Sequence, residues 1–335
     1  MDPARAEPLI RFAEEIRPRL RTSADSSALE EVESRYAELM EALEWLPEQA
    51  RVDDAHQLAS NLVPVWIATK RIDDGDRWFT RALDGEGAST ASRARALYDH
   101  GYLVFLAGRY DMADEHFAEA RELAEALGDS NLEALALGGA ARVALDGDPE
   151  EAVRLLRRAV AVTADVPEST GRSSALHVLG VALQMSGDLC GAREVMLERL
   201  EAGRAASSQS IVFVESANLS MVERKLGNYE AAESLSRDAV RIAVSRGDQM
   251  AIAWVLNGLA AVTGAKSQYE RAATLLGAAE AQLERAGGEW PPDERTQYEE
   301  TLAALKTAAP ADLERWRQAG RGMTPDDAAA YALGE

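Results

Sequence analysis

The sequence predicts an all-α solenoid of about six helix pairs, on three observations. Alanine, the strongest helix former, occurs 63 times in 335 residues, whereas aromatic residues, which favour strands, make up 6%. One phrase recurs about every 40 residues, as FLAGRYDMAD, ALDGDPEEAV, QMSGDLCGAR and RKLGNYEAAE. Small and large residues keep fixed places within this repeat. A fixed period of this length is typical of stacked helix hairpins.

The turn between the two helices of each pair is marked mostly by glycine. Glycine takes the left-handed conformation that ends a helix without steric cost. Asp148, Asp188 and Asn228 each follow a turn glycine and are expected to cap the next helix. The six turn positions, with Lys70 and Ser267 as exceptions to glycine, are Lys70, Gly108, Gly147, Gly187, Gly227 and Ser267.

Residue size also follows the repeat. Alanine recurs twelve residues after the turn, with Arg199 as an exception. A large apolar residue recurs nine residues after the turn, with Ser236 as the exception. We expect small residues to let helices approach closely and large ones to fill the gap between neighbouring pairs. The small position five residues after the turn is Gly75, Ala113, Ala152, Ala192, Ala232 and Ala272, and the large position is Phe79, Phe117, Leu156, Met196 and Leu276.

Both ends are predicted to be helical caps, because the terminal face of a solenoid is otherwise apolar. We expect a cap over residues 1–53, six helix pairs over 54–286, and a second cap over 287–335. In the first cap, residues 8–20 and 28–46 read as one helix each, from the spacing of their apolar residues. Trp45, Trp66 and Trp78 are expected to pack the first repeat against this cap. Thr324 is expected to cap the last helix.

The repeat resembles the tetratricopeptide repeat (TPR), which has small residues at its eighth, twentieth and twenty-seventh positions. The ends are similar to the C-terminal arm of LuxR-type and SARP-type regulators of the STAND ATPase class, in the phrases EVESRYAELMEALEWL, RWFTRAL and DLERWRQAGRGMTPDDAAAYAL. The resemblance implies a right-handed solenoid that receives a ligand or protein signal and relays it to an ATPase. The sequence has no GxxxxGK[ST] phosphate loop and no basic helix–turn–helix, so the ATPase and DNA-binding activities of the family are not implied.

Charge and composition exclude several kinds of partner. The 36 basic and 57 acidic residues give a formal charge of −21, which repels phosphate backbones and anionic lipid, so we expect no direct nucleic-acid or membrane partner. The lone cysteine, Cys190, is expected to be a half-buried filler and fits a reducing compartment. No apolar run is long enough for a bilayer and no signal peptide is visible. These features predict a cytoplasmic protein.

The resemblance implies that the first helix of each pair lines the concave face of the stack. This face would be mostly apolar, with a few polar groups, as in a pocket for a small molecule or an apolar peptide. An aromatic stripe at helical spacing is equally typical of a core, and a phase error of one residue would convert groove to core, so both interpretations stay open. The candidate ligand-binding residues are Arg95, Tyr98, Tyr102, Phe105, His177, Gln184, Met221, Arg224, Trp254 and Asn257.

Three hypotheses for function remain. The leading one is a non-catalytic binding module without a cofactor, which recognises a small molecule or peptide and signals to a regulator ATPase or another protein. The second is a protein scaffold whose acidic outer faces bind a basic partner. The third is a specialised-metabolite enzyme or self-resistance binder, with Glu215 or Glu223 as base if buried in a cleft. No catalytic motif favours the third, and no two histidines have metal-ligand spacing.

Overall fold

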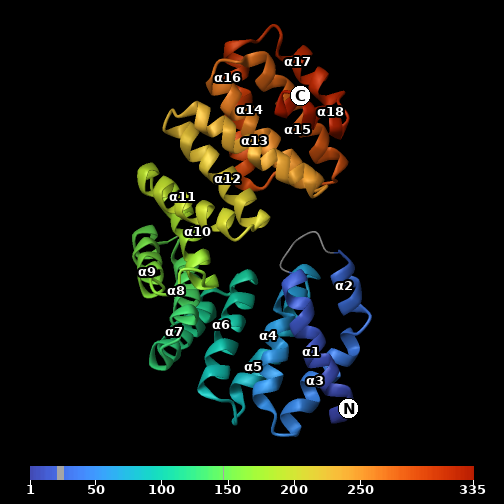
Figure 1. The fold of residues 1–335 in the computed structure, drawn as a ribbon, viewed down its shortest axis with the longest axis vertical. Helices are drawn as coiled ribbons and strands as arrows, with labels where there is room; N and C mark the ends of the chain where they lie inside the picture. The colour runs from blue at the N-terminus through green and yellow to red at the C-terminus, as the bar shows by residue number, and fades with distance from the viewer. Residues whose placement is uncertain (21–25, 146) are drawn as a thin grey trace. The chain divides into compact units, whose positions relative to one another are not determined.

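The computed structural model describes residues 1–20, 26–145 and 147–335, and every regular element in these ranges is an α-helix (Figure 1). The chain divides into two compact units, Met1–Ala182 and Leu183–Glu335. The first contains α1 (Pro3–Leu20), α2 (Ser26–Glu33), α3 (Tyr36–Glu48), α4 (Val52–Ala68), α5 (Ile72–Asp84), α6 (Thr90–Leu106), α7 (Tyr110–Leu127), α8 (Ser130–Ala144) and α9 (Pro149–Val162). The division falls within α10 (Thr170–Met185). The second contains α11 (Leu189–Ala205), α12 (Gln209–Lys225), α13 (Tyr229–Ser245), α14 (Gln249–Ala265), α15 (Tyr269–Arg285), α16 (Pro292–Ala308), α17 (Leu313–Arg321) and α18 (Pro325–Leu333).

Consecutive helices pack as hairpins within each unit. Within the first unit, α6 lies along α7 and α8 lies along α9, and within the second unit α12 lies along α13 and α14 along α15. Successive hairpins also contact each other, as α7 does with α8 and α13 with α14. Each hairpin therefore buries its apolar face against the next one, which is how a repeat unit that has no core of its own becomes stable.

At five of the six predicted turn positions, all but Gly147, the backbone takes the left-handed conformation that the repeat predicts. Gly108, Gly187 and Gly227 have φ values of 77°, 85° and 83°. Lys70 and Ser267, at the same position of their own repeats, also have positive φ, at 58° and 61°. A side chain is strained there because its Cβ lies too close to the following carbonyl oxygen. The turn geometry thus extends to the first and last pairs, although glycine is missing from both.

Replacing Ser267 by glycine is expected to stabilise the protein. Removing the Cβ relieves the strain at φ 61°, which corresponds to about 1 kcal/mol of unfolding free energy. The matched control is Gly227→Ala, at a turn with φ 83° and open space around the added Cβ, which is expected to lose a similar amount. Urea denaturation followed by circular dichroism measures both. A Ser267→Gly protein that is no more stable than the wild type would contradict the strain argument.

The size pattern of the repeat is reproduced in the packing. An added Cβ at Gly75 would lie 2.5 Å from Cε3 of Trp66, so only glycine fits there. An added Cβ at Gly101 would lie 2.9 Å from Cε1 of Phe117. The residues at the small and large positions are buried, and their predicted roles in packing are confirmed. The most deeply buried of them are Ala113, Ala152, Ala192, Ala232, Ala272, Phe79, Leu156, Met196 and Leu276.

Two of the three helix caps predicted after the turn glycines are confirmed. Side-chain oxygens of Asp148 and Asp188 accept hydrogen bonds from the third residues after them, at 3.0 and 2.9 Å. The prediction for Asn228 was wrong, because its side chain makes no cap hydrogen bond. Its Nδ2 instead donates to the Oε2 of buried Glu223 at 2.7 Å. A buried carboxylate needs hydrogen-bond donors more than an exposed helix end does.

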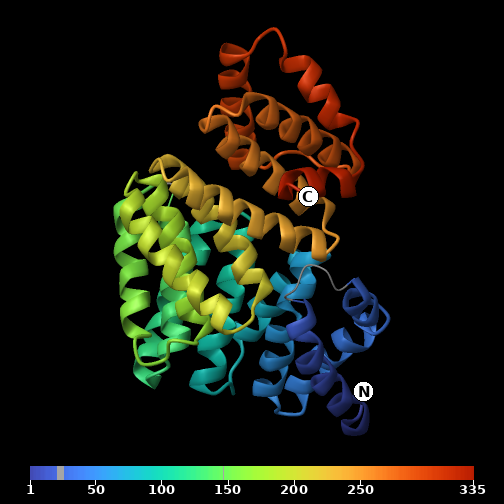
Figure 2. The same ribbon diagram turned by 45° about the horizontal axis from the view of Figure 1, so that its top comes forward.

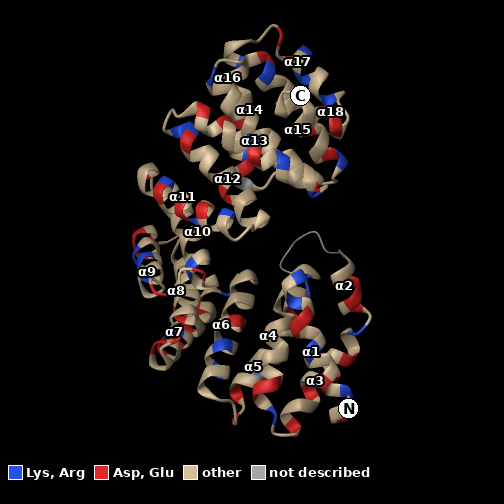
Figure 3. Ribbon diagram, viewed as in Figure 1, with Lys and Arg blue, Asp and Glu red and all other residues tan. Residues whose placement is uncertain are grey.

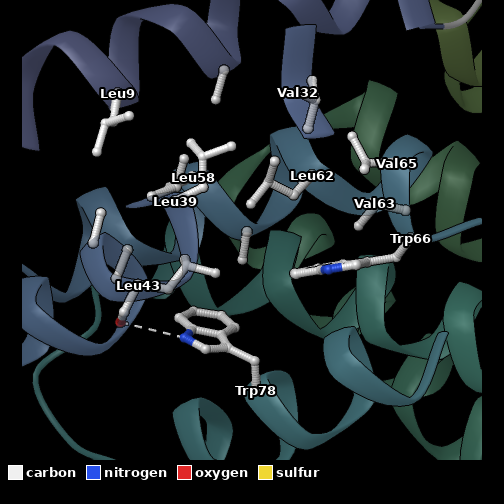
Figure 4. Packing of buried hydrophobic residues seen from close by; sticks show 14 of the residues in the cluster. Leu9, Val32, Leu39, Leu43, Leu58, Leu62, Val63, Val65, Trp66 and Trp78 are labelled. Carbon is white, nitrogen blue, oxygen red and sulfur yellow. Dashed lines mark hydrogen bonds between the residues drawn. The ribbon is translucent and has the colours of Figure 1, made fainter. Parts of the chain in front are cut away.

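The N-terminal helices cover the first repeat. The Nε1 of Trp66 donates to the Tyr36 hydroxyl at 3.0 Å, and the Nε1 of Trp78 donates to the carbonyl oxygen of Leu43 at 3.4 Å. Figure 4 shows Trp66 and Trp78 among the leucines and valines of α1 to α4. Trp45 is partly buried against the same cluster. The predicted packing of these tryptophans is confirmed.

The single helix predicted over residues 28–46 is wrong. The structure has two helices, α2 and α3, separated at Ser34 and Arg35. The Ser34 hydroxyl donates to the carbonyl oxygen of Glu31 at 2.7 Å, and the Arg35 amide donates to the carbonyl of Val32. Serine often ends a helix in this way, because its side chain competes with the backbone for hydrogen bonds.

Three C-terminal helices cover the last repeat. Helix α15 contacts α16, α17 and α18, and Figure 2 shows these red helices beside the orange last pair. Glu280 on α15 is buried and accepts from the hydroxyl of Tyr298 on α16 at 2.9 Å. Arg317 and Arg321 on α17 bind the same carboxylate at 2.6 and 2.7 Å. Burial and this carboxylate raise the pKa of Tyr298 to about 12. Thr324 caps α18 as predicted, in a reciprocal capping box.

Charged residues are interspersed along the helices of both units. Figure 3 shows acidic and basic positions side by side on most of the ribbons.

Cys190 is exposed near the start of α11, so its prediction as a half-buried filler was wrong. It follows the capping residue Asp188 at the open end of the helix, where little packs over it. None of the helices in the described ranges is both long and apolar enough to cross a bilayer.

Candidate functional site

A cavity of about 260 Å³ lies between the helices of the second unit. Its walls come from α12, α13 and α14, and the start of α16 and the residue before it close one side. Most of the lining is apolar, and the polar groups are few. The lining residues are Phe213, Val214, Ala217, Asn218, Ser220, Met221, Arg224, Ser236, Ala239, Trp254, Val255, Gly258, Val262, Pro291, Glu294 and Gln297.

The two main walls follow from helical periodicity. On α12, Ala217, Met221 and Arg224 are spaced four and three residues apart, which places them on one face. On α14, Trp254 and Gly258 are four residues apart in the same way. Met221, Arg224 and Trp254 are three of the residues that the sequence marked as candidate ligand contacts. The structure brings these three to one cavity.

Arg224 is the cation of this cavity. Its guanidinium makes no ion pair or hydrogen bond with any residue that the structure describes, and its Nε is buried without a partner. Burial lowers the pKa of this group, and the carboxylate of Glu300 opposes that effect. Arginine nevertheless stays charged. The charge of Glu300 offsets part of the cost of burying this cation, and an anion bound beside Arg224 would offset more of it.

Trp254 adds a second unused donor to the same cavity. Its Nε1 is buried and has no hydrogen-bond partner among the described residues. One amide and one carboxylate near it bind each other. Nδ2 of Asn257 donates to the carbonyl oxygen of Glu294 at 3.1 Å and to its Oε2 at 2.8 Å. Asn257 is fully buried beneath the wall and positions Glu294, which lines the cavity.

Gln184, another predicted contact residue, packs against the cavity from outside its lining. Its Nε2 lies 3.1 Å from the Sδ of Met221. A thioether sulfur is a weak acceptor, so this contact adds little binding energy. Its main effect is to fix the orientation of the Met221 side chain. Gln184 is half-buried at the end of α10. It therefore supports the wall that Met221 forms.

The remaining predicted contact residues belong to the first unit. Arg95 pairs with Asp99 one turn later on α6, at 2.8 Å, and stacks over the ring of Tyr98 at 5.5 Å. Burial and the charge of Asp99 raise the pKa of Tyr98 to about 12. Tyr98, Tyr102 and Phe105 are partly buried against the cluster formed with Phe117. These aromatic residues thus contribute to inter-helix packing.

Three of the four histidines occupy different environments. His100 is buried, its Nε2 donates to the Oδ1 of Asp76 at 2.8 Å, and its ring lies 4.7 Å from that of His116, as a core histidine would. Burial lowers the pKa of His116 to about 4, and neighbouring His100 contributes. His177 is half-buried on α10 within the first unit. No group of three or more histidine, cysteine, aspartate or glutamate side chains in the described ranges has metal-ligand geometry.

The two carboxylates that were candidate bases are held by arginines. Glu215 on α12 is fully buried and forms an ion pair with Arg199 of α11. Glu223 is 2% exposed, and the Nε of Arg193 lies 2.7 Å from its Oε1. Neither residue lines the cavity. Their geometry is that of structural ion pairs between neighbouring helices.

Sequence reasoning missed several lining residues. Pro291, Glu294 and Gln297 come from a segment assigned to the C-terminal cap, and nothing in their spacing pointed to a site. Ser220 and Ser236 did carry a signal. Ser236 stands where five other repeats have a large apolar residue, and such a break within a strict repeat marks a place where packing is incomplete.

The stacked hairpins, their left-handed turns and their fixed small residues define an α-solenoid of the tetratricopeptide type. Residues 92–165 and 212–285 match the family model of the tetratricopeptide repeat. The chain therefore contains tetratricopeptide repeats, and the predicted fold class, an all-α TPR-like solenoid, is confirmed.

Relatives of known sequence are regulators. A Mycobacterium tuberculosis protein whose name describes it as an HTH-type transcriptional regulator is 27% identical over 241 residues, or 68% of this chain. The aligned segment spans 27% of that protein's length, so the chain corresponds to about a quarter of it. This weak similarity agrees with the predicted resemblance to regulators of this kind.

Solved structures share the fold at low sequence identity. A STAND protein from Pyrococcus horikoshii with a tetratricopeptide repeat sensor aligns over 100% of this chain and 52% of its own, with a TM-score of 0.60 and 12% identity. A Rap protein complexed with competence and sporulation factor aligns over 94% of this chain and 88% of its own, with a TM-score of 0.56 and 16% identity. At such identities the similarity concerns the fold alone.

Proposed function

We propose that this chain is the sensor module of a signalling regulator, and that the cavity of its second unit binds the signal. The signal would be a small molecule or a peptide, and the module would pass its bound state to an ATPase or another protein. The single observation that carries the proposal is the mostly apolar cavity lined by Arg224 and Trp254, each of which has a buried donor nitrogen without a hydrogen-bond partner among the described residues.

The chemistry of the lining supports binding rather than catalysis. Ligand pockets are mostly apolar and have a few convergent polar groups that fix the orientation of the ligand. Here the aromatic face of Trp254 and the side chains of Phe213 and Met221 supply apolar contact. A general base is expected to be free to accept a proton in the cavity, whereas Glu294 already accepts hydrogen bonds from Asn257.

The relatives favour the same role. The Pyrococcus protein is described as having a tetratricopeptide repeat sensor, and the Rap protein was solved in complex with competence and sporulation factor. The mycobacterial relative is named as a transcriptional regulator. Since the chain matches only about a quarter of that regulator, a role as the sensing part of a larger system is the simplest interpretation.

A binding screen with cavity variants tests the proposal. The wild-type protein would be screened against metabolites, natural products and short peptides, with thermal shift as readout and ligand-observed NMR as confirmation. Trp254→Ala is expected to weaken the affinity of the hits by at least about tenfold, because an aromatic anchor is lost. Tyr102→Ala, on α6 of the first unit, is the matched control and is expected to leave the affinity unchanged.

Two outcomes would contradict the proposal. Ligands that stabilise the wild type and Trp254→Ala equally would exclude the cavity as their site. A protein that responds to no compound, but binds a basic partner in a pull-down that weakens with salt, would favour the scaffold hypothesis instead.

A further inference from the structure

The cavity lies where one repeat lacks the large side chain that the other five repeats have. Five repeats place Phe79, Phe117, Leu156, Met196 or Leu276 at one position, and each of these is at most 1% exposed. The fifth repeat has Ser236 there, and Ser236 lines the cavity together with Ser220 and Ala239. The side chain that fills the space between hairpins elsewhere is absent here. The cavity is thus a gap in the regular packing of the repeat.

The part of the cavity lined by Ser220 and Ser236 favours an apolar group. The Ser220 hydroxyl donates to the carbonyl oxygen of Ala232 at 2.9 Å, and the hydroxyls of Ser220 and Ser236 lie 2.6 Å apart. Since Ser220 uses its proton on Ala232, Ser236 donates to Ser220. Both hydroxyl protons are therefore used inside the protein. Ala239 and Val255 complete this part of the lining.

Arg224 and Trp254, by contrast, require a hydrogen-bond acceptor from the ligand. Both side chains contribute hydrogen-bond donors, Nε of Arg224 and Nε1 of Trp254, that are buried without a partner in the described part of the chain. Both need an acceptor, and the charge of Arg224 favours an anionic one. Glu294 is the acidic residue of the lining, and its Oε2 is already bound to Asn257.

The volume of the cavity limits the size of the ligand. A dry protein cavity of about 150 Å³ accommodates benzene, so a cavity of about 260 Å³ has room for a ring and a short chain. We propose that the cavity binds a small organic acid, with its apolar group in the gap at Ser236 and its carboxylate on Arg224 and Trp254. This inference rests on the proposed function and names the chemical class of its ligand.

The test compares one acid with its uncharged analogue. The probes are 4-phenylbutyrate and 4-phenylbutyramide, which differ in charge and hardly in shape, and binding is measured by ligand-observed NMR and by titration. The acid is expected to bind at least about tenfold more tightly than the amide, because a charge-assisted hydrogen bond is lost. Arg224→Gln is expected to remove this preference, and Arg224→Lys, which keeps the charge, to retain part of it.

A second pair of variants tests the gap at Ser236. Ser236→Met restores the side chain that the fourth repeat has at this position and is expected to reduce binding of the acid at least tenfold. Ser234→Met, at an exposed position on the same helix, is the matched control and should bind as the wild type does. If Ser236→Met does not fold, Arg224→Gln still tests the inference, because the replacement breaks no hydrogen bond or ion pair of Arg224 among the described residues.

The outcomes separate this inference from the proposed function. Equal affinity for the acid and the amide, or equal affinity of the wild type and Arg224→Gln for the acid, would overturn the inference. The amide or another neutral compound could still bind to the wild type and fail to bind to Ser236→Met. In that case the proposed sensor function would stand, and only the inference about an organic acid would be overturned. A short peptide ending in a phenylalanine carboxylate that bound far better than any small acid would overturn the choice of a small molecule. The complete absence of binding to the cavity would contradict both the inference and the proposed function.

Discussion

Gly320→Ala is expected to detach α17 from the last repeat and to lower the free energy of unfolding by about 3 kcal/mol. A Cβ at Gly320 would lie 1.9 Å from the carbonyl oxygen of Thr274 on α15. The reciprocal contact is as close, because a Cβ at Gly277 on α15 would lie 2.0 Å from the carbonyl oxygen of Arg317. Backbone atoms cannot rotate away as a side chain can, so the two helices must separate.

The matched control for this variant is Gly322→Ala. Gly322 directly follows α17, and a Cβ there would meet no atom closer than 3.5 Å. Thermal denaturation measures the stability of both proteins, and hydrogen exchange of the α17 amides shows where it is lost. Wild-type protection of α17 in Gly320→Ala would contradict the close approach of these helices.

Arg199→Met is expected to cost about 3–5 kcal/mol, because it leaves the charge of Glu215 buried without its partner. Glu215 is fully buried on α12, and the side chain of Arg199 on α11 is 13% exposed. Arg199 stands where most other repeats have alanine. A buried ion pair between two neighbouring hairpins thus explains both why Arg199 replaces alanine and why Glu215, a candidate base, is buried.

A double-mutant cycle separates the pair from its surroundings. The variants are Arg199→Met, Glu215→Leu and the double variant, and urea denaturation gives the unfolding free energy of each. The double variant is expected to be more stable than Arg199→Met, since an apolar pair of similar volume has no buried charge to compensate. A loss below about 1 kcal/mol in Arg199→Met would mean that the pair behaves like one at the surface.

Part of the candidate site was visible in the sequence. Periodicity on the first helices of the fifth and sixth repeats pointed to Met221, Arg224 and Trp254, which line one cavity. The same reasoning also selected Tyr98 and Phe105, which pack against the cluster around Phe117. Helical spacing tells which residues share a face, but not whether another helix covers that face. That distinction depends on contacts between segments far apart in the chain.

Apart from the break at Ser34 and Arg35, the chain alone determined its helices, its turns and the register of its repeats, because these depend on local propensity and on a period of small and large residues. Even the left-handed turns at Lys70 and Ser267 follow from that register. Only the tertiary structure decided which charges are neutralised. It pairs Arg199 with Glu215, and beside a cavity it leaves the Nε of Arg224 without a hydrogen-bond partner among the described residues. The physical reason is that ion pairing and cavity formation depend on distances between helices, and α16 reaches α12 and α14 only in the folded protein.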